Sequence, residues 1–172
     1  KDRDIKIRWR PFELRPFPVP TLKVEDEYLP SIWKHSVYPL ADKLGVDIKL
    51  PKISPQPRTN KAFEAFAYAD DCGMGNEFSM AVMNAFFQHG KNIGDVTVLT
   101  ELGEKIGLNR DDMQRVLESN LYKKQHQRAL QQAYDEDKVT VVPTIIIGER
   151  RYQGFPSKNW LINALDSLEL TI

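Results

Sequence analysis

The sequence predicts an α/β protein in which a long helical section separates an N-terminal strand from a C-terminal hairpin and helix. Residues 5–10 alternate apolar and basic side chains, which is the period of a strand with one buried face. From about residue 26 to residue 137 the apolar residues recur at intervals of three and four, as in amphipathic helices. A continuous β-branched run at 144–147 then predicts a strand buried on both faces. The length of 172 residues suits one domain that carries an insertion.

Charge and composition exclude several classes of protein. Lys+Arg and Asp+Glu both number 24, so no net field favours a nucleic acid or an anionic membrane as partner. No apolar run is long enough to cross a bilayer and the N-terminus has no apolar signal core, so the cytoplasm is the default expectation. The single cysteine excludes an intrachain disulfide. His35, His89 and His126 lack the spacing of metal ligands, so we expect surface or helix-face histidines and neither metal nor cofactor.

In the first third of the chain, prolines and a glycine predict where helices begin, kink and end. Four prolines within residues 11–20 forbid a helix and a central strand, which predicts an extended connector. A helix is expected over roughly 26–44. Pro30 suits its first turn, Pro39 should kink or split it, and Gly45 is its C-terminal stop.

Further helices are predicted in the middle of the chain. They cover about 59–71 and 76–89, follow the N-caps Asp95 and Asn109, and end with a polar helix over 121–137. The aromatic and methionine stripe of the 76–89 helix is typical of core packing.

A proline stands at the entrance of the C-terminal hairpin. Because Pro143 cannot donate to a sheet ladder, it should lie at the first residue of a strand, at an edge or at a bulge. The residues at 148–150 offer a tight turn from the 144–147 strand into a second strand around 151–153. Ser157 is the expected N-cap of a final helix.

Four segments, in order along the chain, carry a family resemblance. They are RWRPFELRP, WKHSVYPLADKLGVDIKLPKISPQPRTNKAFEAFAYA, AFFQHGKNIGDVTVLTELGEKIGL and VVPTIIIGERRYQG. Together they resemble the DsbA-like thiol–disulfide oxidoreductases, in the branch that includes relatives of 2-hydroxychromene-2-carboxylate isomerase. The resemblance implies a thioredoxin-like fold with an all-helical insertion. Residues 1–25 and 138–172 would form an incomplete thioredoxin-like domain and residues 26–137 the insertion, while the N-terminal strand and catalytic helix are absent from the chain.

The resemblance also assigns a role to the loop before the 144–147 strand. It implies a cis peptide bond between Val142 and Pro143, and substrate binding by Val142, Pro143 and Thr144. A cis bond there turns the strand entrance and leaves the Val142 backbone N–H and C=O available to a substrate backbone. Without the family, a proline that only starts a strand is an equal alternative.

The family's catalytic motif, C-x-x-C, is missing from the sequence. It lies at the N-terminus of a helix, where the helix dipole favours a thiolate, and family order places it before residues 5–10. Cys72 does not replace it, because Asp70, Asp71 and the predicted C-terminal end of a helix all disfavour a thiolate there. We therefore expect no catalytic residue in this chain. The chain should be part of a longer protein, or another chain should supply a strand between 5–10 and 144–147.

Three functions follow from these observations. The first is a thiol–disulfide oxidoreductase that acts on protein or peptide thiols and disulfides through a mixed disulfide. The alternatives are a glutathione-dependent isomerase of the 2-hydroxychromene-2-carboxylate type and a redox-inactive thioredoxin-fold module that binds extended peptides. Whether this chain is part of an enzyme is left open by the sequence, because the cysteine pair is not in it. Strand exchange or oligomerisation through the unfilled sheet position is a further expected interaction.

Overall fold

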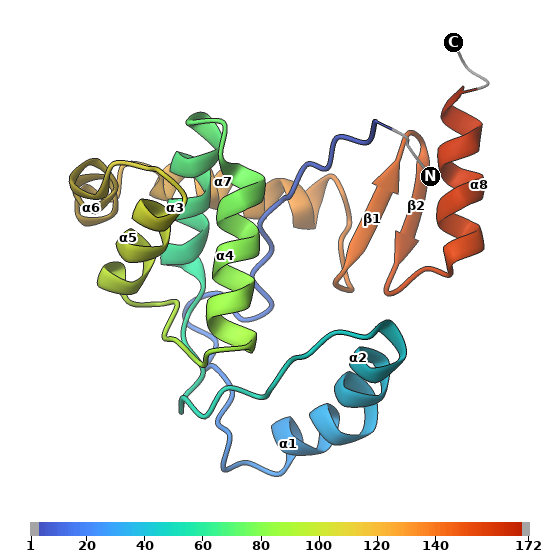
Figure 1. Ribbon diagram of the computed structural model, residues 1–172, viewed down its shortest axis with the longest axis horizontal. Coiled ribbons are helices and arrows are strands. Elements are labelled where there is room, and N and C mark those ends of the chain that lie inside the picture. Colours follow the sequence, from blue (N-terminus) through green and yellow to red (C-terminus); the bar gives the residue numbers. More distant parts are fainter. Residues whose placement is uncertain (1–3, 170–172) are drawn as a thin grey trace. The chain divides into compact units, whose positions relative to one another are not determined.

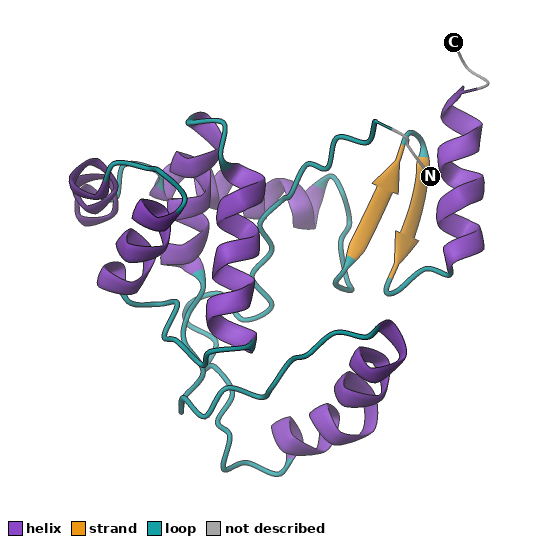
Figure 2. Ribbon diagram, viewed as in Figure 1, coloured by secondary structure: helices purple, strands orange, loops and turns teal. Residues whose placement is uncertain are grey.

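The computed structural model describes residues 4–169, and the chain divides into two compact units (Figure 1). The first unit is Lys1–Arg128 and the second is Ala129–Ile172. The secondary structure is mostly helical, with one small two-stranded sheet (Figure 2). The domain bounds that the family resemblance implies, 1–25 with 138–172 against 26–137, stay a prediction. Within residues 4–169, no helix has the length and apolar character that a membrane span requires.

The predicted strand at residues 5–10 is wrong. This segment forms no ladder with any described part of the chain, and Ile5 and Ile7 are 50% and 60% exposed. An alternating pattern indicates that the apolar side chains on one face prefer to be buried. A strand also needs a neighbouring strand whose backbone hydrogen-bonds with its own. The segment is held by a side chain instead, because Trp9 Nε1 donates to Asn76 Oδ1 at 2.9 Å.

The helix predicted over 26–44 forms, and it is interrupted before Pro39. It consists of α1 (Tyr28–Ile32), the π-helical segment η1 (Trp33–Val37) and α2 (Tyr38–Leu44). At the end of η1 the Tyr38 N–H bonds to the Trp33 C=O, five residues back. Pro39 has no N–H to offer the carbonyl four residues before it, and the wider π turn accommodates that loss. Gly45 ends α2 with φ 67, as predicted.

Four helices form the core of the first unit. They are α3 (Asn60–Asp71), α4 (Gly75–Phe87), α5 (Val96–Lys105) and α6 (Arg110–Ser119). Phe78, Leu99, Met113 and Leu117 are almost completely buried where these helices meet. The stripe predicted for the 76–89 helix faces this core, because Phe78 and Ala85 are buried and Val82 and Phe86 pack against them.

The second unit is built on a hairpin. It contains the end of α7 (Lys123–Asp135) together with β1 (Thr144–Ile147), β2 (Arg150–Gln153) and α8 (Lys158–Glu169). The strands pair antiparallel, with Ile145 opposite Tyr152, and α8 lies along one face of the hairpin (Figure 2). On that face the Tyr152 and Trp160 rings are 4.9 Å apart. Ile146 faces the other way and is 49% exposed, so the prediction of burial on both faces is wrong within the described residues.

The predicted N-caps are confirmed. Asp95 Oδ1 accepts from the Thr97 N–H at 2.8 Å at the start of α5. At the start of α6, Asn109 Oδ1 accepts from the Asp112 N–H at 2.9 Å. At the start of α8, Ser157 Oγ accepts from the Trp160 N–H at 3.2 Å. Each cap pairs a backbone N–H that the first turn of a helix leaves without an intrahelical acceptor.

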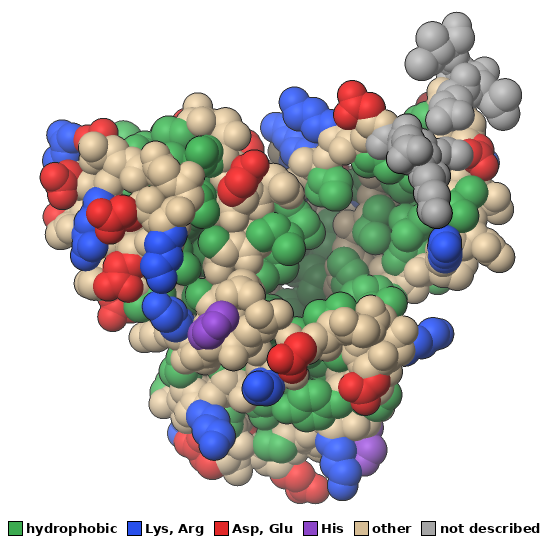
Figure 3. Space-filling view, in the orientation of Figure 1, with side chains coloured by type: hydrophobic (Ala, Val, Ile, Leu, Met, Phe, Trp, Pro, Cys, Tyr) green, Lys and Arg blue, Asp and Glu red, His purple; other side chains and the backbone are tan. Residues whose placement is uncertain are grey.

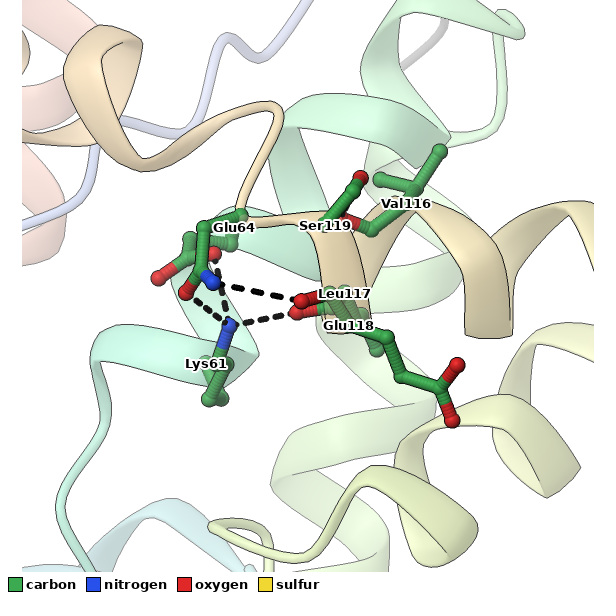
Figure 4. Close-up of polar contacts among 7 residues, drawn as sticks. Lys61, Glu64, Val116, Leu117, Glu118 and Ser119 are labelled. Carbon is green, nitrogen blue, oxygen red and sulfur yellow. Dashed lines mark hydrogen bonds and ion pairs between the residues drawn. The ribbon is translucent and has the colours of Figure 1, made fainter.

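A buried charge cluster joins α3 to the end of α6 (Figure 4). Glu64 is 2% exposed and pairs with Lys61 Nζ at 3.0 Å. The same ammonium donates to the Leu117 backbone C=O at 2.6 Å and to Asn120 Oδ1 at 2.8 Å. Asn120 has φ 55 and is the left-handed C-cap of α6, so the lysine charge lies at the negative end of that helix. Three acceptors thus compensate the burial of the pair.

Replacing Lys61 by methionine should destabilise the first unit strongly, because the buried Glu64 carboxylate loses its counter-charge. We expect Lys61→Met to lower the free energy of unfolding by about 3–5 kcal/mol in urea denaturation. The double variant Lys61→Met/Glu64→Met should recover most of that loss. Lys105→Met, at an exposed lysine of α5, is the matched control and should change stability by less than about 0.5 kcal/mol. Equal effects of the two single variants would contradict a role for the cluster.

Candidate functional site

The loop that enters β1 contains the three residues predicted to bind substrate. The Val142–Pro143 peptide bond is cis, which confirms the geometry that the family resemblance implied. Thr144 Oγ1 donates to the Val141 carbonyl at 2.6 Å and closes the loop on itself. The structure thus places Val142, Pro143 and Thr144 together at the point where the hairpin ladder begins.

Two backbone groups of this loop, the N–H and the C=O of Val142, have no hydrogen-bond partner within residues 4–169. The Gly154 N–H donates to the Pro143 C=O at 2.7 Å, which continues the register of the hairpin by one step beyond Thr144. In the described part of the chain, no strand pairs with the outer edge of β1. A free donor and a free acceptor beside an open strand edge can pair with an extended peptide backbone.

Several apolar side chains of this loop and of the segment after β2 are exposed. Val141, Val142 and Phe155 are 45%, 38% and 56% exposed, and Pro143 is exposed between them. We call these four residues the apolar patch. In Figure 3, hydrophobic side chains are visible on the surface over the hairpin. A surface of this kind is typical of sites that bind other proteins or peptides.

Cys72 lies in the first unit, exposed at the C-terminal end of α3 as predicted. Two tyrosines neighbour it. Burial raises the pKa of Tyr122 to about 12, and the hydrogen bond from its hydroxyl to Asp71 at 2.7 Å acts in the same direction. Burial also raises the pKa of Tyr68, and the adjacent Cys72 contributes to that rise. Both hydroxyls therefore stay protonated well above neutral pH and cannot serve as bases that would activate the thiol.

The first unit contains a buried pair that was not predicted from the sequence. His126 was expected at a surface or helix face, but it is 4% exposed and its Nε2 lies 2.5 Å from Glu13 Oε1, whose residue is 6% exposed. Phe63 stacks on the imidazole with ring centroids 5.3 Å apart, and Nδ1 is buried without a partner among the described residues. One signal was available. His126 falls on the stripe of α7 that includes Ala129 and Ala133, at the spacings of a helix face.

Phe63 also lines a cavity of about 150 Å³ in the first unit. The other walls include Trp9, Phe66, Phe78 and Val82, so the cavity is largely apolar. It offers space but few polar groups that could orient a reacting molecule. In the described part of the chain, no three His, Cys, Asp or Glu side chains gather as a metal site.

The pair of Glu13 and His126 should stabilise the first unit, because it links the N-terminal segment to α7. His126→Phe keeps a ring on Phe63 but leaves the buried Glu13 carboxylate with one hydrogen bond fewer. We expect the free energy of unfolding to fall by about 1–3 kcal/mol in urea denaturation. His89→Phe, at an exposed histidine, is the control, and identical unfolding curves for the two variants would show that the pair contributes nothing.

Comparisons with known proteins agree with this geometry. The uncharacterized protein YwbO of Bacillus subtilis (strain 168) is 42% identical over 160 residues, which cover 92% of this chain and 80% of YwbO. A structure of 2-hydroxychromene-2-carboxylate isomerase is similar with a TM-score of 0.68 and 21% identity, covering 80% of this chain and 66% of the isomerase. A proposed protein disulfide isomerase from Nitrosomonas europaea gives a TM-score of 0.66 and 14% identity, covering 85% of this chain and 76% of that one. The sequence matches the DSBA-like thioredoxin domain over residues 1–165, and the chain therefore belongs to that family.

Proposed function

We propose that this chain is the substrate-docking part of a DsbA-like thiol–disulfide oxidoreductase. Val142, Pro143 and Thr144 hold an extended peptide beside a cysteine pair that lies outside these 172 residues. The observation that carries the proposal is the Val142 backbone: the residue is 38% exposed, and its N–H and C=O are without a partner in residues 4–169. Family membership supports the thiol chemistry, and the likeness to solved structures supports the fold.

The reaction is a two-electron exchange. One thiolate of the pair attacks a substrate disulfide, forms a mixed disulfide and releases a substrate thiolate; the second thiol of the pair then displaces the other substrate sulfur. The pair ends oxidised and the substrate reduced, and the reverse sequence oxidises a substrate dithiol. This chain contributes orientation. Hydrogen bonds from Val142 to the substrate backbone hold the substrate sulfur at one distance and angle through both displacements.

We also propose that the hairpin and α8 belong to a larger thioredoxin-like sheet. A two-stranded hairpin is marginally stable by itself. The open outer edge of β1 and the half-exposed Ile146 support a further strand beside it. That strand comes either from the rest of the same polypeptide or from a second copy by strand exchange. The glutathione-dependent isomerase is the alternative activity, but a likeness at 21% identity supports its fold and not its reaction.

Docking can be measured on the 172-residue chain without the cysteine pair. A short extended peptide with serine in place of its cysteine should shift the Val142 amide resonance in heteronuclear NMR spectra. N-methylating the peptide residue that pairs with Val142 should weaken binding about tenfold, since one backbone hydrogen bond is lost. Equal binding of every N-methylated peptide, or shifts confined to other residues, would overturn the proposal. Binding of glutathione alone would favour the isomerase.

The chain by itself should not catalyse disulfide reduction. Insulin reduction driven by dithiothreitol should proceed at the uncatalysed rate with the 172-residue chain and with its Cys72→Ser variant alike. If the chain accelerates insulin reduction and Cys72→Ser does not, Cys72 is a reactive thiol. The chain then does more than dock the substrate.

A further inference from the structure

We propose that the cavity in the first unit binds one uncharged molecule with a single aromatic ring, such as phenol. The cavity has a volume of about 150 Å³, and every residue of its wall belongs to the first unit. The docking loop belongs to the second unit. The inference is therefore independent of the proposed docking function, and either of the two can fail without the other.

The wall of the cavity comes from parts of the chain that lie far apart in sequence. Trp9 and Pro11 belong to the N-terminal segment, Phe63 and Phe66 to α3, and Phe78 to α4. Four of these five side chains are aromatic. Aromatic rings contact a bound ring edge to face or offset and face to face, which adds to the gain from burying its apolar surface. The wall therefore favours an aromatic ligand.

Two of the aromatic walls are held in place by residues behind them. Trp9 Nε1 donates to Asn76 Oδ1 at 2.9 Å in the first turn of α4. The Phe63 ring stacks on the imidazole of His126, whose Nε2 lies 2.5 Å from Glu13 Oε1. These contacts keep both rings where they are in the empty cavity. A ligand that enters does not have to order the wall, which lowers the cost of binding.

The volume sets the size of the ligand. An apolar cavity of about 150 Å³ is large enough for one benzene-sized molecule. A fused two-ring molecule exceeds that space. Water is a poor occupant, because it needs two to four polar partners and this wall is largely apolar. Met83, also in the wall, supplies a thioether that makes favourable contacts with aromatic rings.

The polar groups of the wall favour a neutral ligand. Among the described residues that line the cavity, Ser79 supplies the one hydroxyl, which can hydrogen-bond to a hydroxyl on the ring. Arg10 supplies the one charge, but it is exposed and already has an interaction within the chain. A carboxylate on the ring would lose its hydration against the apolar wall. A ring with one hydroxyl loses less and gains a partner.

The test is a titration of the 172-residue chain with phenol, in which NMR follows the methyl resonances of Val82 and Met83 in the wall. We expect both resonances to shift and to saturate. Benzoate and 1-naphthol should bind at least about tenfold more weakly than phenol, because one is charged and the other has two rings. Ser79→Ala should weaken phenol binding about fivefold and leave benzene binding unchanged, because benzene has no hydroxyl.

Two further variants locate the ligand. Ala62→Leu enlarges a buried wall residue of α3 and should weaken phenol binding at least about tenfold. Met80→Leu is the control, because Met80 is 55% exposed on α4 and lies outside the wall, and it should bind phenol as the unchanged chain does. If Ala62→Leu loses the amide dispersion of the folded chain, the ligand series on the unchanged chain decides.

Several results would overturn the inference. The first is the absence of saturable shifts at Val82 and Met83, which would mean that phenol does not enter the cavity. Benzoate or 1-naphthol binding as tightly as phenol would contradict the ligand class. Phenol binding that is unchanged in a folded Ala62→Leu variant would show that the ligand lies elsewhere.

Discussion

The hydrogen-bond ladder of the hairpin ends at Pro143, and the candidate site depends on that ending. Pro143 has no backbone N–H, so the ladder continues only through its carbonyl, which accepts from Gly154. The adjacent Val142 N–H and C=O have no partner within residues 4–169. An unpaired peptide group is costly when buried, but an exposed one is hydrated and can exchange water for another backbone. The loop is therefore open to a peptide at little cost to the stability of the hairpin.

Two buried polar links hold distant segments of the first unit together in different ways. Lys61 lies at the negative end of α6 and donates to three acceptors, one of which is the Glu64 carboxylate. Glu13 and His126 instead join the proline-rich N-terminal segment to α7, and one imidazole nitrogen stays unpaired among the described residues. Side-chain contacts of this kind take the place of a sheet ladder in a segment where prolines limit regular backbone pairing.

Local features were predictable and features that need a distant partner were not. The caps at Asp95 and Asn109 and the stop at Gly45 depend on residues within three or four positions, and the structure has them where the sequence predicts them. The strand at 5–10 failed because its pattern says nothing about which backbone would lie beside it. His126 lies on a helix, as expected, but its burial was not predicted because its partner Glu13 is 113 residues away in the sequence.

By itself the sequence determined the family, the order of the helices and the hairpin, the absence of C-x-x-C and, through the family, the cis bond before Pro143. Only the tertiary structure decided which backbone groups of the loop are free and that Glu13 and His126 are buried together. The physical reason is the range of the interactions. Capping, turns and periodicity act between near neighbours in the chain, whereas register and burial are set by segments that meet only after folding.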